Sequence, residues 1–220
     1  MTYRVCIPSY NRAGRVVTHE WFDNPVIVVP KSQEADYRKY YGELVVAIAD
    51  ELDGSAPRKR NAVLNLYPGE NILMVDDDMT AISRRKNKIP LGKQEIAHLA
   101  ENAFLMCSEI GAGMWGINMN LDPMKHRDFH PLSLTKPVYW FVGILPDDIR
   151  YDERLLLGED LDFYLQKLNK YRKVLRFNNY QPEIFLSKEG GIQQRDKWLE
   201  WHRIVEQKWG SDIVHIKDTS

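Results

Sequence analysis

Three consecutive aspartates follow a short apolar segment in the stretch ENILMVDDDM, residues 70–79. Residues two apart in an extended segment point the same way, so Asp76 and Asp78 can reach one ion while Asp77 points elsewhere. Paired carboxylates are hard oxygen ligands that suit Mg²⁺ or Mn²⁺ and leave coordination positions open for phosphate oxygens. The pattern predicts a metal site that neutralises a diphosphate, and a solvated acidic turn or a helix cap is the alternative.

A second pair of carboxylates, Glu159 and Asp160, follows Gly158 in the stretch LGEDLDF, residues 157–163. A carboxylate beside a substrate hydroxyl can act as a general base and activate that hydroxyl for attack. Acidic residues in the first turn of a helix also cap the helix, which is the alternative interpretation.

Two further segments carry side chains that bind phosphates or bases. The segment APRKRN, residues 56–61, opens a predicted helix and contains three cations, Arg58, Lys59 and Arg60. Cations at a helix N-terminus are typical of a phosphate or diphosphate site, and a solvated basic face is the alternative. The segment IPSYNR, residues 7–12, places Tyr10 after an apolar run, where it stacks on a nucleobase or merely leaves the sheet in a turn.

The first third of the chain alternates short apolar runs with polar, helix-like segments. The runs predict strands at 3–8, 25–30, 44–49 and 71–75, with helices at 32–42 and 57–67 between them. Continuous apolar strands separated by helices indicate a parallel sheet covered on both faces. Ligands of such sheets bind beyond the carboxyl ends of the strands, where the three aspartates fall.

The remainder of the chain is more mixed. Its patterns predict helices at 93–111, 158–171 and 193–210, strands at 113–120, 137–145, 173–177 and 183–187, and a loop at 121–136. No linker divides the sequence, so we expect one domain over 1–220. Residues 1–80 form its first half, and 81–220 form a second half with the closing helix.

The composition narrows the class of protein. The chain has 220 residues, of which 44% are hydrophobic and 28% charged, and its formal net charge is -1, so overall charge indicates no polyanion partner. Cys6 and Cys107 stand in apolar segments and read as reduced core residues. No signal peptide and no membrane span is apparent, and we expect a cytoplasmic protein.

Four motifs in order, IPSYNR, RKRN, ILMVDDDM and GEDLDF, resemble the GT-A glycosyltransferases, especially the large inverting family that includes cellulose and chitin synthases. The resemblance implies an α/β fold with a Rossmann-like, mostly parallel central sheet flanked by helices and a C-terminal α+β acceptor-side portion. It implies a divalent metal, Mn²⁺ or Mg²⁺, on Asp76 and Asp78, and Asp160 as the base with Glu159 in support. It also implies donor contacts at Pro8, Tyr10, Arg12, Arg60, Asn61, Asp76 and Asp77.

Three features look more like the TET-associated glycosyltransferases: an IVVP strand, a tyrosine-rich helix after it, and an R-N pair before the three aspartates. That family is linked to bacteriophages and hypermodified DNA. That resemblance implies sugar transfer to hydroxymethylated pyrimidines in an infected host cell. The sequence departs from the larger family at the end of the second strand, which has Pro30 and Lys31 instead of aspartates that hold uracil. It also offers Lys188 where a C-terminal histidine often completes the metal shell, which leaves His202 and His215 as candidates.

Basic and aromatic segments bear on a DNA acceptor. The clusters SRRKNK (83–88) and KYRKVLR (170–176) can hold phosphates, and a base extruded from a duplex can stack on Trp115 or on the VYWF segment. Solvated surface and ordinary core are the alternatives. The candidate acceptor contacts are Arg84, Arg85, Lys86 and Trp115.

Together these features predict a metal-dependent, inverting glycosyltransferase that moves a hexose from a nucleotide sugar, UDP-linked, to a hydroxymethylated pyrimidine in double-stranded DNA. We expect no membrane and no obligate protein partner. Three alternatives remain: a glycosyltransferase acting on a glycan, lipid or protein; a nucleotidyltransferase of related fold; and a non-catalytic nucleic-acid-binding module.

Overall fold

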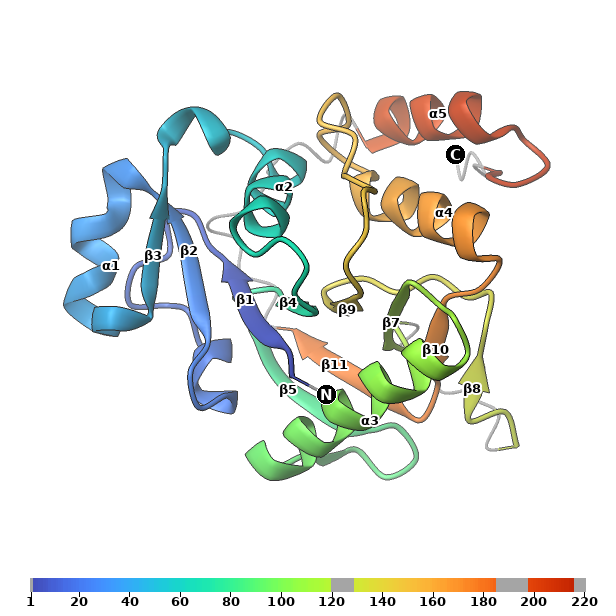
Figure 1. Ribbon diagram of the computed structural model, residues 1–220, viewed down its shortest axis with the longest axis horizontal. Helices are drawn as coiled ribbons and strands as arrows, with labels where there is room; N and C mark the ends of the chain where they lie inside the picture. Colours follow the sequence, from blue (N-terminus) through green and yellow to red (C-terminus); the bar gives the residue numbers. More distant parts are fainter. Residues whose placement is uncertain (1, 120–128, 185–197, 216–220) are drawn as a thin grey trace.

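The structure, a computed structural model, describes residues 2–119, 129–184 and 198–215. Within these residues, eight strands form one sheet in the order β3-β2-β1-β4-β9-β7-β10-β8 (Figure 1). These strands are β1 Arg4–Pro8, β2 Val26–Pro30, β3 Val45–Ile48, β4 Ile72–Val75, β7 Met114–Ile117, β8 Leu132–Ser133, β9 Phe141–Ile144 and β10 Leu175–Phe177.

The sheet is mostly parallel, as the sequence predicted. Strands β3, β2, β1 and β4 run parallel to one another, and β10 runs parallel to β7. Strand β9 is antiparallel to both of its neighbours, β4 and β7. Strand β9 therefore begins at the edge where β1 and β4 end, and this edge carries the aspartate motif.

Helices cover both faces of the sheet. They are α1 Glu34–Tyr41, α2 Ala56–Leu66, α3 Lys93–Glu109, α4 Glu159–Tyr171 and α5 Trp198–Trp209, with 3₁₀ helices η1 Thr18–Trp21, η2 Lys31–Gln33, η3 Gly42–Leu44 and η4 Asp50–Leu52. Successive strand residues alternate between two cores: Leu73 packs with the α1 and α3 side, and Met74 with the α2 and α4 side. Because both faces are buried, the strands read as continuous apolar runs.

The structure differs from the predicted elements in the second half. A second, antiparallel sheet in the order β11-β5-β6 contains β5 Met79–Arg84, β6 Ile89–Pro90 and β11 Tyr180–Ile184. No strand was predicted at β5 or β6. Strand β5 pairs with β11, about a hundred residues away, and β6 is a two-residue strand that pairs with β5, so local pattern reports neither. The predicted loop at 121–136 contains the short strand β8, and its residues 121–128 lie outside the described ranges.

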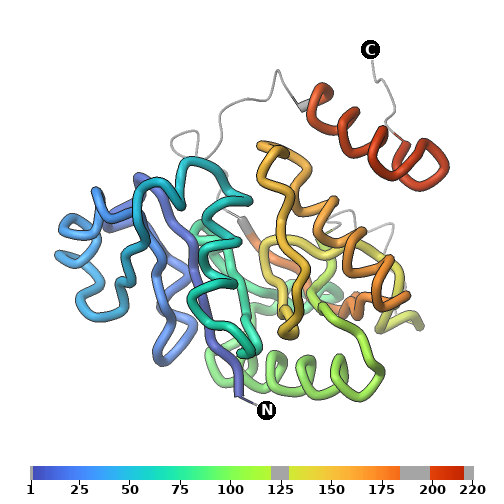
Figure 2. The backbone as a smooth tube through the Cα atoms, turned by 45° about the horizontal axis from the view of Figure 1, so that its top comes forward, coloured from blue at the N-terminus to red at the C-terminus, as the bar shows by residue number. Residues whose placement is uncertain are grey.

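Helix α5 packs on the sheet-distal side of α4 (Figure 2). The Trp209 indole Nε1 donates to Asp162 Oδ1 at 2.8 Å, and Lys208 Nζ lies 2.9 Å from the same oxygen. Asp162 is fully buried in the first turn of α4, so these contacts fix α5 beside the residues that precede α4. Within the described residues, no helix is long and apolar enough to cross a membrane.

Candidate active site

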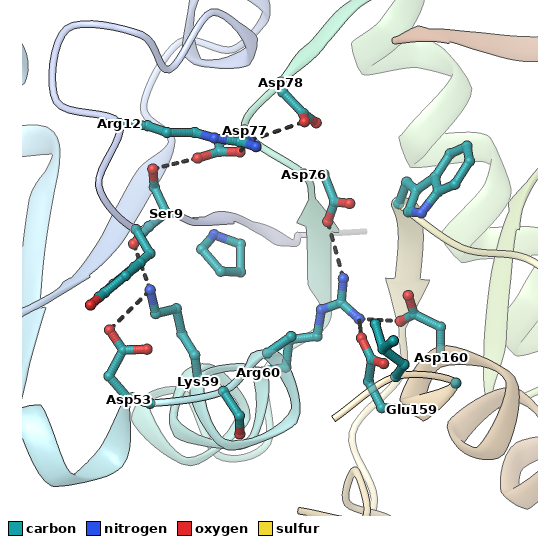
Figure 3. A pocket seen from close by; sticks show the side chains of 18 of the residues that line it. Ser9, Arg12, Asp53, Lys59, Arg60, Asp76, Asp77, Asp78, Glu159 and Asp160 are labelled. Carbon is teal, nitrogen blue, oxygen red and sulfur yellow. Dashed lines mark hydrogen bonds and ion pairs between the residues drawn. The ribbon is translucent and has the colours of Figure 1, made fainter. Parts of the chain in front are cut away.

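A cavity of about 680 Å³ opens at the carboxyl edge of β1 and β4. Its first wall consists of lining residues from the segments 8–12, 53–60 and 76–78. Its second wall consists of Trp140, the segment 157–160 and His202. The residues of the first wall lie at the ends of β1 and β4 and at the start of α2. Those of the second wall lie before β9, at the start of α4 and on α5. Residues far apart in the sequence therefore meet at this cavity (Figure 3).

The guanidinium of Arg60 connects the two walls. Its Nη2 donates to Asp76 Oδ1 at 3.2 Å, and its Nη1 donates to Glu159 Oε1 at 3.1 Å and to Asp160 Oδ1. Figure 3 shows this side chain between Asp76 on one side and the two acidic residues of α4 on the other. Both carboxylate motifs therefore meet on one buried cation.

Burial and neighbouring charges shift the pKa values of Arg60 and of the three carboxylates that it contacts. Desolvation raises the pKa of Asp76 and that of Asp160 to about 7 each, although the charge of Arg60 opposes both shifts. Desolvation also raises the pKa of Glu159. Burial acts to lower the pKa of Arg60, but the charges of Asp160 and Asp76 outweigh it, and the guanidinium pKa stands well above its usual value.

Asp77 and Asp78 contact a different arginine. Asp77 accepts hydrogen bonds from the Ser9 hydroxyl and from Arg12, and Arg12 Nη1 lies 3.0 Å from Asp78 Oδ2. Tyr37 Oη lies 2.8 Å from Ser9 Oγ and accepts from the Arg12 backbone N–H at 2.8 Å. This network ties the turn after β1 to the turn after β4.

Lys59 is the third cation of the first wall and, like Arg60, it is buried. Its ammonium donates to the Ser9 carbonyl at 2.6 Å, lies 3.1 Å from Asp53 Oδ2, and lies 5.1 Å from the centroid of the Tyr10 ring. Burial lowers the pKa of Lys59. Tyr10 is 52% exposed and lines the cavity, so an aromatic surface is accessible at this end.

The carboxylates fit a divalent metal that is completed by a substrate. Within the described ranges, no three His, Cys, Asp or Glu side chains are grouped so as to hold a metal. Asp76 and Asp78 nevertheless supply two hard oxygen donors at the end of β4, and Mg²⁺ is commonly held by one or two carboxylates together with substrate phosphates. The donor set thus suits a metal that arrives with a diphosphate.

The second wall has a different character. Trp140 adopts a left-handed backbone with φ of 59°, and its carbonyl accepts from the Asp76 N–H at 2.9 Å. Gly158, at φ of 78°, precedes α4, and a Cβ there would meet Val205 Cγ2 of α5 at 3.2 Å. His202 of α5 also lines the cavity, whereas His215 is exposed and lies 3.8 Å from Glu206.

The cavity gathers most of the residues that the sequence singled out. Those that line it are Pro8, Tyr10, Arg12, Arg60, Asp76, Asp77, Asp78, Glu159 and Asp160. Their roles remain predictions. Sequence reasoning missed Ser9 and Asp53, and it named Trp140 only as part of the VYWF segment. Ser9 could have been identified from its position directly after the first predicted strand, at the edge of the sheet where ligands bind.

Two of the expected contacts are wrong. Asn61 was expected to touch the donor, but it is buried away from the cavity, where its amide donates to the Tyr151 carbonyl at 2.9 Å and its Oδ1 accepts from the Tyr151 N–H at 2.8 Å. Trp115 was expected to touch the acceptor, but it is 0% exposed and packs edge-on against Phe104 and Phe141. Both residues stabilise the fold.

The cations after the aspartate motif do not form one surface. Arg84 is exposed at the end of β5 and pairs with Glu95 at 2.7 Å, and Lys86 is exposed. Arg85, which was predicted to contact acceptor phosphates, with a solvated basic face as the alternative, is instead buried. None of the three lines the cavity. Lys188 lies outside the described residues.

Comparison with solved structures supports the fold. The chain is similar to the Staphylococcus aureus TarS 1–349 structure in complex with UDP-GlcNAc, with TM-score 0.58 and 15% identity over 99% of this chain and 68% of that one. It is also similar to the mannosyltransferase PcManGT from Pyrobaculum calidifontis in complex with GDP-Man and Mn²⁺, with TM-score 0.59 and 11% identity over 94% and 61% of the two chains. These similarities confirm a GT-A-type fold.

Sequence comparison identifies the family of the chain, beyond its fold. The chain is 38% identical over 79 residues to the beta-glucosyl-HMC-alpha-glucosyl-transferase of Enterobacteria phage T6, and 37% identical over 79 residues to that of phage T2. Each match covers 34% of this chain and only 28% of the relative. The family model described as TET-Associated Glycosyltransferase matches residues 3–183. The chain therefore belongs to the TET-associated glycosyltransferase family.

Proposed function

We propose that this chain is a glycosyltransferase that moves a hexose from a nucleotide sugar, UDP-linked, to a hydroxyl carried by a modified pyrimidine of double-stranded DNA. The observation that carries the proposal is the meeting of Asp76 and Asp160 on the guanidinium of Arg60. A donor that binds at Asp76 is thereby brought beside a half-buried carboxylate suited to act as a base.

The first wall is suited to the donor. Tyr10 offers an accessible aromatic surface for a nucleobase, and the cations of the first wall offset the charge of a diphosphate. Asp76 and Asp78 would hold a Mn²⁺ or Mg²⁺ ion, whose chemistry is to neutralise charge on the leaving diphosphate. The solved relatives bound to UDP-GlcNAc and to GDP-Man with Mn²⁺ have the same fold, which supports this class of donor.

Asp160 acts as the general base in this proposal. Its carboxylate takes the proton of the acceptor hydroxyl while that oxygen attacks the anomeric carbon, and the bond from that carbon to the diphosphate oxygen breaks. The positive charge of Arg60 favours the ionised form of Asp160 against the effect of burial. A single displacement of this kind inverts the anomeric configuration.

The names of the phage relatives suggest a second possible acceptor, a sugar already attached to the base. They describe an alpha-glucosyl transfer to beta-glucosyl-HMC, so the acceptor hydroxyl of those proteins belongs to a sugar already attached to the base. By that analogy the acceptor of this chain is either the hydroxymethyl group or a hexose on it. Either acceptor places the reaction in a phage-infected cell. An α-linked product from an α-linked donor requires retention, which would remove Asp160 from the role of base.

Donor turnover tests the proposal. We would incubate the chain with Mn²⁺ and a panel of UDP- and GDP-sugars, with duplex DNA that carries cytosine, 5-hydroxymethylcytosine or glucosylated 5-hydroxymethylcytosine. We expect sugar to appear on modified DNA alone, and NMR of the product should show an inverted anomeric configuration. The variant Asp78→Asn should transfer no sugar. Release of pyrophosphate from a nucleoside triphosphate, with no sugar transfer, would instead indicate a nucleotidyltransferase.

A further inference from the structure

Trp140 has an uncommon backbone for a bulky side chain. Its φ of 59° lies in the left-handed region, which glycine and asparagine tolerate and which tryptophan rarely adopts. Such a conformation persists only where its surroundings determine it, and it is common at ligand-binding sites. Trp140 is half-buried and lines the cavity directly.

Backbone contacts fix Trp140 relative to the aspartate motif. Its carbonyl accepts from the Asp76 N–H at 2.9 Å, and the next residue, Phe141, pairs with Val75 at the start of β9. The Phe141 N–H donates to the Tyr139 carbonyl at 2.6 Å, which tightens the turn at Trp140. The backbone of Trp140 is therefore fixed beside Asp76, in the cavity that the acidic residues of α4 also line.

Charge distinguishes the wall to which Trp140 belongs. In the described chain, the cations that line the cavity are Arg12, Lys59 and Arg60, and all three belong to the first wall. The second wall combines Trp140, Leu157 and His202 with the carboxylates of Glu159 and Asp160. A phosphate beside these carboxylates would be repelled, whereas an uncharged ring can stack on the indole and donate its hydroxyls to carboxylate oxygens.

We propose that Trp140 and Leu157 form an acceptor subsite in which the indole stacks on an uncharged ring that carries the attacking hydroxyl. This inference rests on the proposed function for the identity of the ring, which is the hydroxymethylated pyrimidine or a hexose attached to it. The phosphates of the acceptor stay outside the cavity. An extruded group that reaches in without its backbone satisfies this arrangement.

Two substitutions at Trp140 test the subsite. Trp140→Gly removes the ring at a φ that glycine adopts without strain, and Trp140→Phe restores a smaller aromatic face. We expect the acceptor KM to rise about tenfold in Trp140→Gly and to recover in part in Trp140→Phe, because stacking on one aromatic ring contributes about that much. The donor KM should stay within about twofold. The matched control is Tyr10→Ala in the first wall, which should raise the donor KM and leave the acceptor KM unchanged.

Binding without turnover separates this inference from the proposed function. Anisotropy of a fluorescent duplex carrying hydroxymethylcytosine, or its glucosylated form, measures affinity in the absence of any sugar donor. Weaker binding of at least one modified duplex to Trp140→Gly, with affinity for unmodified DNA unchanged, supports the subsite even if no donor is turned over, and the duplex affected identifies the ring. Equal affinity of wild type and Trp140→Gly for both modified duplexes overturns the inference.

Discussion

The two walls of the cavity are organised by different physical means. In the first wall, buried and half-buried cations are held by opposite charges: Lys59 by Asp53, and Arg12 by Asp77 and Asp78. In the second wall, backbone conformation positions the groups, since Trp140 and Gly158 both have a left-handed φ. The first wall therefore presents fixed charges, and the second presents an aromatic surface beside two carboxylates.

This difference bears on which substrate each wall can accommodate. Removing one member of a buried ion pair leaves the other uncompensated, so the charges of the first wall are costly to change. The uncharged side chains of the second wall, Trp140 and Leu157, can be altered without leaving a buried charge unpaired. Under the proposed function, the charged donor suits the first wall and the uncharged ring of the acceptor suits the second. Arg60 joins the two walls, so it is the place where they can be uncoupled.

The largest expected effect is at the base. Asp160→Asn keeps the size of the side chain but removes its capacity to accept a proton, and we expect kcat to fall by about 10²- to 10⁴-fold. Affinity for the nucleotide sugar should change little, and titration calorimetry with the donor measures this. The matched control is Asp148→Asn, an exposed carboxylate paired with Lys170 outside the cavity, which should not alter kcat. Full activity of Asp160→Asn would exclude Asp160 as the base.

The next effect is at the connection between the walls. Arg60→Lys keeps the positive charge but lacks the planar fork that reaches Asp76, Glu159 and Asp160 together. We expect kcat to fall by about 10- to 100-fold, with a smaller change in the donor KM, in steady-state assays. Arg58→Lys is the control, because Arg58 lies two residues earlier on α2, is exposed, and does not line the cavity. Equal loss in both variants would mean that the bridge has no role in the reaction.

The first wall was more predictable from the sequence than the second. Its strands are short apolar runs, and its charged residues follow the ends of β1 and β4 directly, so position along the chain places them at the sheet edge. The partner of each charge was not predictable: Arg60 was expected to hold a diphosphate, and it pairs with acidic residues a hundred positions away. Asn61, its neighbour on α2, faces the other way because adjacent helical residues point in different directions.

The second wall depends on conformations that no local pattern announces. Trp140 stands in an apolar segment that reads as a uniform strand, and its left-handed turn arises from pairing with β4 across more than sixty residues. Trp115, by contrast, follows the same apolar pattern and is core. Composition could not separate the two tryptophans, because Trp115 lies within β7 whereas Trp140 lies in the turn directly before β9.

A smaller expected effect, on stability, distinguishes backbone strain at Gly158 from its packing against α5. Gly158→Ala places a Cβ in the left-handed region and 3.2 Å from Val205 Cγ2, so the Val205 side chain of α5 must give way slightly. Gly111→Ala is matched, because its φ of 66° carries the same backbone strain and its Cβ meets nothing within 4 Å. We expect about 1–2 kcal/mol of destabilisation in Gly111→Ala and more in Gly158→Ala, measured by urea unfolding. Equal losses would mean that α5 is not held against Gly158.

The smallest effect concerns the surface outside both walls. If acceptor phosphates stay outside the cavity, exposed cations such as Arg84 and Lys86 are placed to meet them, although neither lines the cavity. The double variant Arg84→Ala/Lys86→Ala should raise the KM for modified duplex DNA by a few-fold at low salt, and the difference should fade as salt rises. The kcat should not change, because the reacting groups are untouched. A modified nucleoside without phosphates serves as the control acceptor. An equal rise in KM for that nucleoside would place these cations in ring binding, and the division between a neutral second wall and a charged exterior would then be wrong.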